Sequence, residues 1–491
     1  MEDTDTSFTD NLNDWLGTVR DFVWGPWLLI PLLLITGLVL TFRLRGIQFR
    51  KLLPALRLGL KDRSDDGGEG DISQYQALTT ALAATVGVGN IVGVATAISI
   101  GGPGALFWMW ITGLVGMASK YSEAFLGVRF RVKDAKGNMS GGPQRYLERG
   151  IPGGLGKFLA WFFAIAAVIA SFGIGNMTQA NAVSENLENS FNIDPTVTAV
   201  ILFILTGAVL LGGIKAIGTV TSAFVPLMIL IYIIGGIVVL CINATAIPEA
   251  FGLIFSDAFT GTSAVGGFIG SGIMLALQMG VARGIFSNES GMGSAAVAAA
   301  AAKTTHPTRQ GLVSMTQTFI DTIIVVTFTG LVVICSGVWD QGEDRAGTMT
   351  SDAFTEALPG DWGGNIVTIS IVFFAFSTLL GWSYYGERNA QRIFGSWATV
   401  PYRAIFTCVV VVGATMELDV AWTFSDLANG LMALPNLVGL LILSGLIARE
   451  TKAYLNFDPE LRASAKDIEK FLVDQKTPWS MTSATEAQVT R

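Results

Sequence analysis

Two interrupted apolar segments decide the fold of this chain. The first interruption is Ala83–Asn90, with the sequence AATVGVGN, and the second is Gly280–Gly291, with the sequence GVARGIFSNESG. Apolar residues flank both stretches, and an alanine-rich run from Ala295 to Ala302 follows the second. Glycine at alternate positions is a poor helix former. We therefore expect two helices that are each broken near the middle.

The composition of the chain places these segments in a membrane. Of 491 residues, 51% are hydrophobic and only 14% are charged, and the mean hydropathy is +0.54. Soluble proteins carry about a quarter charged residues. The net charge of −7 argues against a nucleic-acid-binding protein, which would be basic.

Few residues are suited to catalysis or to a disulfide framework. Cys241, Cys335 and Cys408 all lie in apolar stretches, so no disulfide pattern is expected. The single histidine, His306, lies beside Pro307 in a polar turn and leaves little scope for a His-based metal site or a Ser-His-Asp triad. The sequence therefore does not predict an enzyme.

A helix needs roughly 20 apolar residues to span the hydrocarbon core, and about eleven segments meet this requirement. They are residues 22–43, 73–100, 104–128, 157–184, 196–213, 219–243, 263–302, 311–338, 363–390, 401–416 and 423–447. We expect an all-α integral membrane protein with these spans. Residues 22–43 form a retained helix, because the segment is too long and too far from Met1 for a cleaved signal peptide.

Lys and Arg gather in alternate loops, which predicts the orientation. The stretch 44–72 is rich in both and is expected in the cytoplasm, which places the acidic N-terminal residues 1–21 outside. The basic loop 129–149 and the tail 448–491 then also lie in the cytoplasm, and the intervening loops are mainly acidic. The predicted location is the cytoplasmic membrane.

The positions of the two breaks predict an inverted repeat. If residues 22–43 are set aside as an extra helix, the broken helices open two five-helix halves, residues 73–243 and 263–447. Each half has an odd number of spans, so the halves enter the membrane in opposite directions. Interrupted helices at matching positions of two such halves point to the substrate site of a secondary transporter. The alternative is a pair of glycine kinks made for packing alone.

The backbone of a broken helix offers two kinds of ligand. Freed N–H groups at the start of the second half-helix suit a carboxylate, and Asn90 or Ser287 and Asn288 are placed to cap there. Carbonyls at the end of the first half-helix, near Ala83 and Val86, suit a small hard cation. Irregular backbone near the bilayer centre has to be buried in protein or line a cavity.

Polar side chains in two further apolar segments have two readings each. Ser377 and Thr378, in the run Phe374–Thr378, could complete an oxygen cage for sodium, or could bond the preceding helical turn. Gln179 lies on an otherwise apolar helix, where a ligand contact and a bond to another helix are both open.

Charged residues inside the predicted spans need partners, because unpaired charges are costly there. Lys120 and Glu123 are three residues apart on one helix face and are expected to pair. Arg283 and Glu289 could neutralise each other, or Glu289 could favour the positive end of the following half-helix. Asp321 could be a gate or a proton site, or could bond a neighbouring helix.

Four stretches of the chain resemble the alanine or glycine:cation symporter family of prokaryotic amino-acid transporters. They are ALAATVGVGN at residues 81–90, GGPGALFWMW at 101–110, RGIFSNESG at 283–291 and GWSYYGER at 381–388. The resemblance covers about residues 20–450. It implies a LeuT-type fold, with one extra N-terminal helix before a five-plus-five inverted-repeat core, and sodium-coupled uptake of small neutral amino acids.

The resemblance also implies a role for particular residues. Val88, Gly89 and Asn90 would meet the carboxylate of the substrate, Gln179 its polar end, and Phe286 and Trp382 would close a small pocket. On the analogy with the LeuT-type fold, sodium would be held by the carbonyls of Ala83, Val86 and Phe374 and the hydroxyls of Ser377 and Thr378. The chain departs from the family pattern at Val88, where a threonine is expected. That change removes a side-chain hydroxyl and leaves backbone coordination possible.

The sequence thus predicts a sodium-coupled symporter that imports alanine or glycine by alternating access. Sodium is the co-transported ion, the bilayer is the environment, and no nucleic acid or obligate protein partner is expected. A proton-coupled symporter that uses Asp321 or Glu289 is the first alternative. A passive channel would need a continuous polar pore, which the sequence does not offer.

Overall fold

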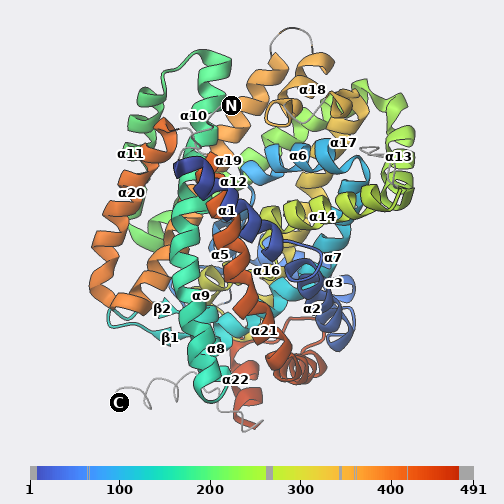
Figure 1. Cartoon of the computed structure of the whole chain (residues 1–491). Helices are drawn as coiled ribbons and strands as arrows, with labels where there is room; N and C mark the ends of the chain where they lie inside the picture. The colour runs from blue at the N-terminus through green and yellow to red at the C-terminus, as the bar shows by residue number, and fades with distance from the viewer. Residues whose placement is uncertain are drawn as a thin grey trace.

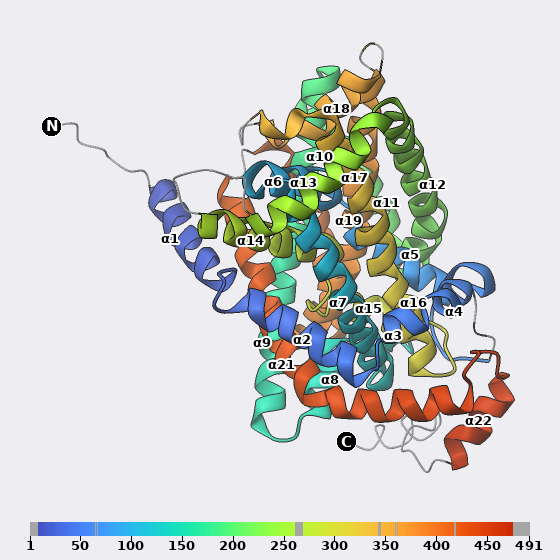
Figure 2. The same cartoon turned by 90° about the vertical axis from the view of Figure 1, so that its right-hand side faces the viewer.

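Helices make up nearly the whole of the computed structural model (Figure 1). Many of the long helices stand upright in Figure 2. The structure describes residues 8–63, 65, 67–260, 269–341, 345–358, 360, 362–416 and 419–474. In this part of the chain the only sheet is a two-stranded antiparallel pair, β1 (Val132–Lys133) and β2 (Met139–Ser140), in which Val132 lies opposite Ser140. The predicted all-α class is confirmed.

The elements of the first half include both ordinary helices and tighter or wider turns, marked η. They are α1 (Phe8–Val23), α2 (Leu29–Arg43), α3 (Ile47–Arg50), α4 (Leu52–Leu56), η1 (Arg57–Asp62), α5 (Gln74–Thr85), η2 (Val88–Asn90), α6 (Val92–Gly101), α7 (Gly104–Arg129), α8 (Pro143–Gly150), α9 (Gly154–Phe172), η3 (Gly173–Met177), α10 (Thr178–Phe191), α11 (Pro195–Leu211), α12 (Gly213–Ile242), η4 (Ala244–Ala246) and α13 (Ile247–Thr260).

The second half continues in the same style. It consists of α14 (Ile269–Asn288), α15 (Ala295–Ala300), α16 (Pro307–Thr318), η5 (Phe319–Val326), α17 (Thr327–Ser336), η6 (Val338–Asp340), α18 (Met349–Ala357), α19 (Trp362–Phe394), η8 (Ser396–Ala398), α20 (Thr399–Thr415), α21 (Asp419–Phe457) and α22 (Ala465–Asp474).

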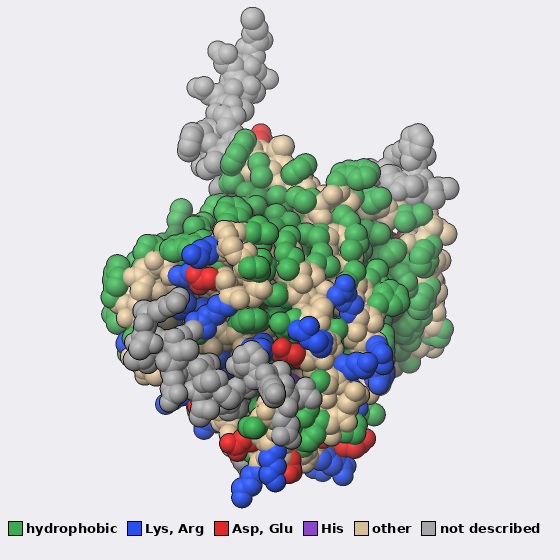
Figure 3. Space-filling view, turned by 90° about the horizontal axis from the view of Figure 1, so that it is seen from below, with side chains coloured by type: hydrophobic (Ala, Val, Ile, Leu, Met, Phe, Trp, Pro, Cys, Tyr) green, Lys and Arg blue, Asp and Glu red, His purple; other side chains and the backbone are tan. Residues whose placement is uncertain are grey.

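Every segment predicted to span the membrane contains helix. Among the described residues, six helical stretches are long and apolar enough to cross a bilayer on their own, and α2, α6 and α11 are shorter apolar helices. Many large side chains on α11, α12 and α20 are exposed and apolar, as expected for surfaces that face lipid. Figure 3 shows Lys and Arg side chains, together with some Asp and Glu, on the lower face of the molecule.

The N-terminal part of the fold differs from the sequence prediction. Residues 22–43 were expected to form one helix, but α1 ends at Val23 and α2 begins at Leu29. Pro26 follows Gly25 in this gap, and proline lacks the N–H that a continuing helix needs. Helix α1 lies against α21 and extends through residues 8–21, most of the predicted N-terminal loop.

The first break lies where the sequence places it, and the second lies later. α5 ends at Thr85 and α6 begins at Val92, with the short turn η2 between them. α14 continues through Gly280 and Gly284 to Asn288, and the break follows it. A Cβ on Gly280 would lie 2.4 Å from the carbonyl oxygen of Ala105 in α7, so glycine there allows two helices to pack closely.

Candidate binding site at the two helix breaks

A pocket of about 240 Å³ opens beside the first break. It lies between the η2–α6 segment, the C-terminal half of α14, α1 and α21. Its lining residues are Arg20, Val88, Gly89, Val92, Gly93, Thr96, Arg283, Phe286, Thr423 and Asp426. Three of the predicted substrate residues, Val88, Gly89 and Phe286, therefore meet at one cavity.

At Gly89 the first break lies close to the end of the second broken helix. A Cβ on Gly89 would lie 2.9 Å from Cδ1 of Phe286 and 3.5 Å from the Cα of Ser287. The aromatic ring of Phe286 can reach this position because glycine has no side chain there. The guanidinium group of Arg283 lies over the same ring, 5.6 Å from its centroid.

The side chain of Asn90 stabilises the break from within. Its Oδ1 accepts a hydrogen bond from the backbone N–H of Gly87 at 3.0 Å, and its Nδ2 donates to Oδ1 of Asp321 at 2.8 Å. The expected capping of the next half-helix is not observed, because Ile91 is the N-cap of α6 and makes no side-chain cap bond. Asn90 is buried and does not line the pocket.

Gln179 connects a second element to the same backbone. Its Oε1 lies 3.5 Å from the backbone nitrogen of Val88, and its Nε2 donates to the carbonyl of Ile174 at 3.0 Å. The amide group thus links α10 to the first break. The contact of Gln179 with another helix segment is observed. The ligand contact, its other reading, stays a prediction.

Four oxygen atoms gather where α5 ends against α19. Ser377 Oγ lies 3.1 Å from the carbonyl oxygen of Ala83 and 2.8 Å from that of Phe374. Thr378 Oγ1 lies 3.1 Å from each of the same two carbonyl oxygens. The predicted bond to the preceding helical turn is observed at Phe374, and both hydroxyls also bond to Ala83 on the neighbouring half-helix. The sodium cage stays a prediction.

Val86 and Gly87 complete this corner. Val86 is buried and leaves the helical conformation, with φ −77° and ψ 83°. A Cβ on Gly87 would lie 2.5 Å from Thr378 Oγ1, so the hydroxyl lies directly against the unwound backbone. All of these ligand candidates are neutral oxygens, and no group of three or more His, Cys, Asp or Glu side chains is found in the described chain.

Charged side chains hold the second break from both sides. Lys120 Nζ donates to the carbonyl of Glu289 at 3.0 Å and lies 4.0 Å from Glu123 Oε2, so the expected pair of Lys120 and Glu123 is confirmed. Glu123 Oε1 accepts from the backbone N–H of Gly293 at 2.9 Å and from Asn436 Nδ2 at 2.8 Å. These groups are buried and fix the irregular backbone between α14 and α15.

Trp382 belongs to the second break and not to the pocket lining. Its Nε1 donates to Glu289 Oε1 at 2.7 Å, and Ser294 donates to the other oxygen of that carboxylate. The ring lies against η3, since a Cβ on Gly175 would lie 2.5 Å from Cγ and 2.9 Å from Cδ2 of Trp382. The observed partners of the Glu289 carboxylate are therefore Trp382 and Ser294, and not Arg283.

Asp321 lies between the two breaks. Its carboxylate accepts from Asn90 Nδ2 in the first break and from Ser287 Oγ, at 2.8 Å, in the second. It lies in η5, a stretch of wider π-type turns between α16 and α17. The bond to neighbouring helices, which was one of its three open readings, is observed.

The sequence analysis missed six of the pocket residues, namely Arg20, Val92, Gly93, Thr96, Thr423 and Asp426. Arg283 lies 3.7 Å from Asp426 Oδ2, so the interpretation that Arg283 and Glu289 neutralise each other is wrong. The only local signal was Asp426 itself, a carboxylate in a segment interpreted as an apolar span. Arg283 and Asp426 together form the polar side of the pocket.

Comparisons with known proteins agree with one another. A model of the sodium:alanine symporter family matches residues 9–467. The sodium/alanine symporter AgcS of Methanococcus maripaludis is 51% identical over 443 residues, which cover 89% of this chain and 96% of the relative. The amino-acid carrier protein AlsT of Bacillus subtilis is 35% identical over 446 residues, covering 90% and 92%. From the same bacterium, a protein named "Probable sodium/glutamine symporter GlnT" is 36% identical over 443 residues, covering 89% and 90%.

Proposed function

From the premise that the chain belongs to the sodium:alanine symporter family, we propose that it imports alanine or glycine together with sodium by alternating access. Membership makes the protein a multi-pass membrane transporter that couples amino-acid transport to a cation, and not an enzyme. The choice of amino acid, the choice of ion and the transport cycle are the proposal.

One observation carries this proposal: the first break touches both candidate sites. Gly87 lies against Thr378 on the side of the four oxygens, and Gly89 lies against Phe286 on the side of the pocket. A cation near Ala83 and a substrate near Gly89 would therefore be held by one short unwound segment. Binding of either ligand would favour the conformation that the other one needs, which is the basis of coupling.

The pocket favours a small substrate. Phe286 occupies the space above Gly89, and Arg283 covers the ring from the outer side. In our proposal Val88, Gly89 and Asn90 hold the carboxylate through the break, and Gln179 contacts the polar end of the substrate. Trp382 does not line the pocket, and in our proposal it acts indirectly, through its hydrogen bond to the carboxylate of Glu289. Sodium is assigned to Ala83, Val86, Phe374, Ser377 and Thr378.

The proposed architecture is the LeuT-type repeat with eleven spans. In this proposal residues 73–243 and 263–447 are the two halves, and α2 (Leu29–Arg43) is the extra helix of the predicted segment 22–43. The described part of each half begins with a broken helix. The two breaks lie near each other in space, since η2 and α14 are in contact and Asp321 bonds to both. Residues 261–268, at the start of the second half, lie outside the described part of the chain.

The proposed orientation places the N-terminus outside and the C-terminus in the cytoplasm of a prokaryotic cell. The basic lower face in Figure 3 supports this assignment. In a variant without native cysteines, a cysteine at Ser7 should react with an impermeant thiol reagent from outside, and one at Ser483 should not. Both positions lie outside the described residues. The reverse pattern would overturn the orientation. If both cysteines react from outside, or neither does, the two ends lie on the same side and the odd number of spans is wrong.

Uptake into proteoliposomes tests the function. Radiolabelled alanine, glycine and glutamine should be offered under an imposed sodium gradient, an imposed proton gradient, or neither. We expect saturable accumulation of alanine or glycine that requires sodium. If uptake follows the proton gradient and ignores sodium, the assigned ion is wrong and Asp321 becomes the first residue to test. Flux that does not saturate and never exceeds equilibrium would indicate a channel.

A further inference from the structure

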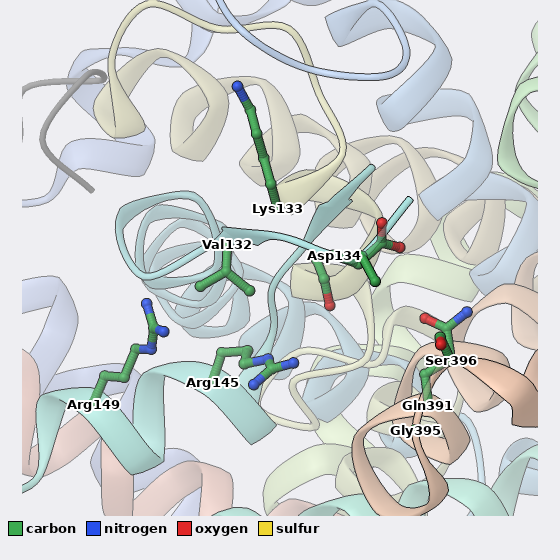
Figure 4. Close-up of a pocket in the computed structure, with 10 residues that line it drawn as sticks. Val132, Lys133, Asp134, Arg145, Arg149, Gln391, Gly395 and Ser396 are labelled. Carbon is green, nitrogen blue, oxygen red and sulfur yellow. The ribbon is translucent and has the colours of Figure 1, made fainter. Parts of the chain in front are cut away.

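A second cavity, larger than the first, lies at the face of the molecule that carries β1, β2 and α8. Its volume is about 840 Å³. Figure 4 shows its lining from the β1–β2 hairpin, α8 and the segment after α19. The lining residues are Val132, Lys133, Asp134, Ala135, Ser140, Arg145, Arg149, Gln391, Gly395 and Ser396. None of them belongs to the two breaks, so the proposed transport sites leave this cavity unexplained.

Of the four charged side chains that line this cavity, Lys133 and Asp134 are each paired with a neighbour, and a third ion pair lies beside them. The pairs are Lys133 with Glu69 at 3.2 Å, Asp134 with Arg388 at 2.8 Å, and Arg392 with Glu148 at 2.7 Å. Lys133 also extends away from Arg145 in Figure 4. These six charges cancel, which leaves the charge of the cavity to Arg145 and Arg149.

Arg145 and Arg149 have no ion-pair partner within the described part of the chain. They lie four residues apart in α8, so both side chains project from one face of the helix. The Nε atom of Arg145 is buried and has no hydrogen-bond partner there. Burial and the nearby positive charges of Arg392 and Arg149 lower the pKa of Arg145 to about 10, which still leaves it charged at neutral pH. Arg149 is exposed, and in Figure 4 its guanidinium group extends in a different direction from that of Arg145. Two positive charges without an ion-pair partner at one cavity favour an anionic ligand there.

Exposed aromatic side chains lie next to the cavity. Phe394 and Trp397 flank the lining residues Gly395 and Ser396, and their ring centroids are 6.4 Å apart. Trp397 is 69% exposed and Phe394 is 56% exposed. Arg392 lies over the ring of Trp161, 5.2 Å from its centroid. Tryptophan prefers the level of lipid headgroups, so this side of the cavity fits the membrane interface.

We propose that this cavity binds a phosphate group through Arg145 and Arg149. Guanidinium groups form paired hydrogen bonds with phosphate oxygens, and basic pockets between helices at the cytoplasmic side suit anionic lipid headgroups. The aromatic rim favours a phospholipid over a soluble phosphate ester as the source of the phosphate. The phosphate site is independent of the proposed transport sites, so either proposal can fail without the other.

The test uses the full-length protein in nanodiscs of phosphatidylcholine with a minor fraction of labelled phosphatidylglycerol. Lipid that remains bound after transfer to detergent is counted by native mass spectrometry. We expect Arg145→Gln/Arg149→Gln to retain about tenfold less phosphatidylglycerol, the loss expected for one charge-assisted hydrogen bond. Arg50→Gln/Lys61→Gln removes the same charge from exposed positions and should retain the lipid within about twofold of the wild type.

Two further arms identify the ligand chemistry. Glycerol phosphate added to nanodiscs of pure phosphatidylcholine tests a soluble source. Binding of glycerol phosphate that depends on both arginines, without selective retention of phosphatidylglycerol, would support the phosphate site and assign it to a soluble ester. Oleate tests whether any anion suffices, and equal retention of oleate and phosphatidylglycerol would overturn the phosphate assignment. Unchanged retention in the Arg145 and Arg149 variant, with an unchanged melting temperature, would overturn the site.

Discussion

The two helix breaks look alike in the sequence but are held by different forces. At the first break, neutral groups satisfy the backbone: Asn90 accepts from Gly87, and Ser377 and Thr378 meet the carbonyl of Ala83. At the second break, buried charges do so: Lys120 bonds to the carbonyl of Glu289, and Glu123 bonds to the N–H of Gly293.

This difference assigns different expected roles to the two breaks, ligand binding at the first and structural support at the second. Val88 and Gly89 of the first break line the pocket, whereas residues 289–294 of the second do not. Buried ionic groups are costly to disturb, because removing one partner leaves the other charge without compensation. Changes at the first break should therefore act mainly on ligand affinity, and changes at the second mainly on folding.

The largest effect is expected at Lys120. Lys120→Met leaves the fully buried carboxylate of Glu123 without its counter-ion, which should cost about 3–5 kcal/mol of stability. Lys133→Met is the matched control, because the pair of Lys133 and Glu69 is well exposed and contributes about 0–1 kcal/mol. Thermal melting in detergent measures both variants. Equal melting temperatures would show that charge does not hold the second break.

Gly89→Ala should act on affinity and leave the fold intact. The added methyl group would lie 2.9 Å from the ring of Phe286 and would favour rewinding of the break. Loss of one charge-assisted hydrogen bond to the carboxylate is worth roughly 1.5–3 kcal/mol. We expect normally inserted protein that binds alanine at least about tenfold more weakly by calorimetry.

Gly93→Ala is the control for that variant. Gly93 lines the same pocket, but a Cβ there meets no atom within 4 Å. Affinity in this variant should stay within about twofold of the wild type. Wild-type affinity in Gly89→Ala would refute the substrate role of the first break.

The paired change Ser377→Ala/Thr378→Val should raise the sodium concentration for half-maximal uptake by about tenfold, or roughly 1.4 kcal/mol. Both hydroxyls reach the carbonyl of Ala83 on the neighbouring half-helix. Ser370→Ala is the control on the same helix, because its hydroxyl bonds only to the carbonyl of Ile366 one turn earlier. A sodium dependence that is the same in all three proteins would remove this corner from the ion site.

A smaller effect is expected on stability at acid pH, and it arises at His306, outside both breaks. His306 lies outside the predicted spans, and burial together with the charges of Arg129 and Arg309 lowers its pKa to about 3. The unfolded chain, with a pKa near 6.5, takes up a proton first, so stability falls as the pH falls below about 6.5. The loss at pH 6 should be about 1 kcal/mol or less.

His306→Asn tests this origin. Asparagine can still accept from the N–H of Thr308 at the start of α16, as His306 does at 3.1 Å. The variant should lose the difference in chemical stability between pH 7.5 and pH 6. A difference of unchanged size would place the acid sensitivity elsewhere in the molecule.

The sequence predicted most of the helices because long apolar segments are a local signal. It did not predict α13 or α18, which are shorter helices between the predicted spans. It placed the second break too early, because it interpreted Gly280 and Gly284 as helix breakers. In the structure both glycines allow α14 to approach α7, with Ala105 and Thr112 as their nearest neighbours. That reason is tertiary and cannot be found in a local window.

The candidate site could be predicted only in part for the same reason. Gly89 and Phe286 stood out because each belongs to an unusual glycine-containing string. The ion pair of Arg283 with Asp426 joins residues that are far apart in the chain, and no spacing rule connects them. The roles of Asn90 and Trp382 were likewise set by partners on other helices, Asp321 and Glu289.

Helix α21 sets a geometric limit on how the protein can lie in a bilayer. With 39 residues at about 1.5 Å each, it is roughly 58 Å long, about twice the thickness of the hydrocarbon core. Figure 2 shows that its later part (red) lies across the bottom of the molecule while the earlier part stands upright. Glu450, in the later part, bonds to Arg129 at the end of α7. One continuous helix thus provides both a candidate membrane span and a second arm that crosses the base of the bundle, and hydropathy alone would count this segment only once.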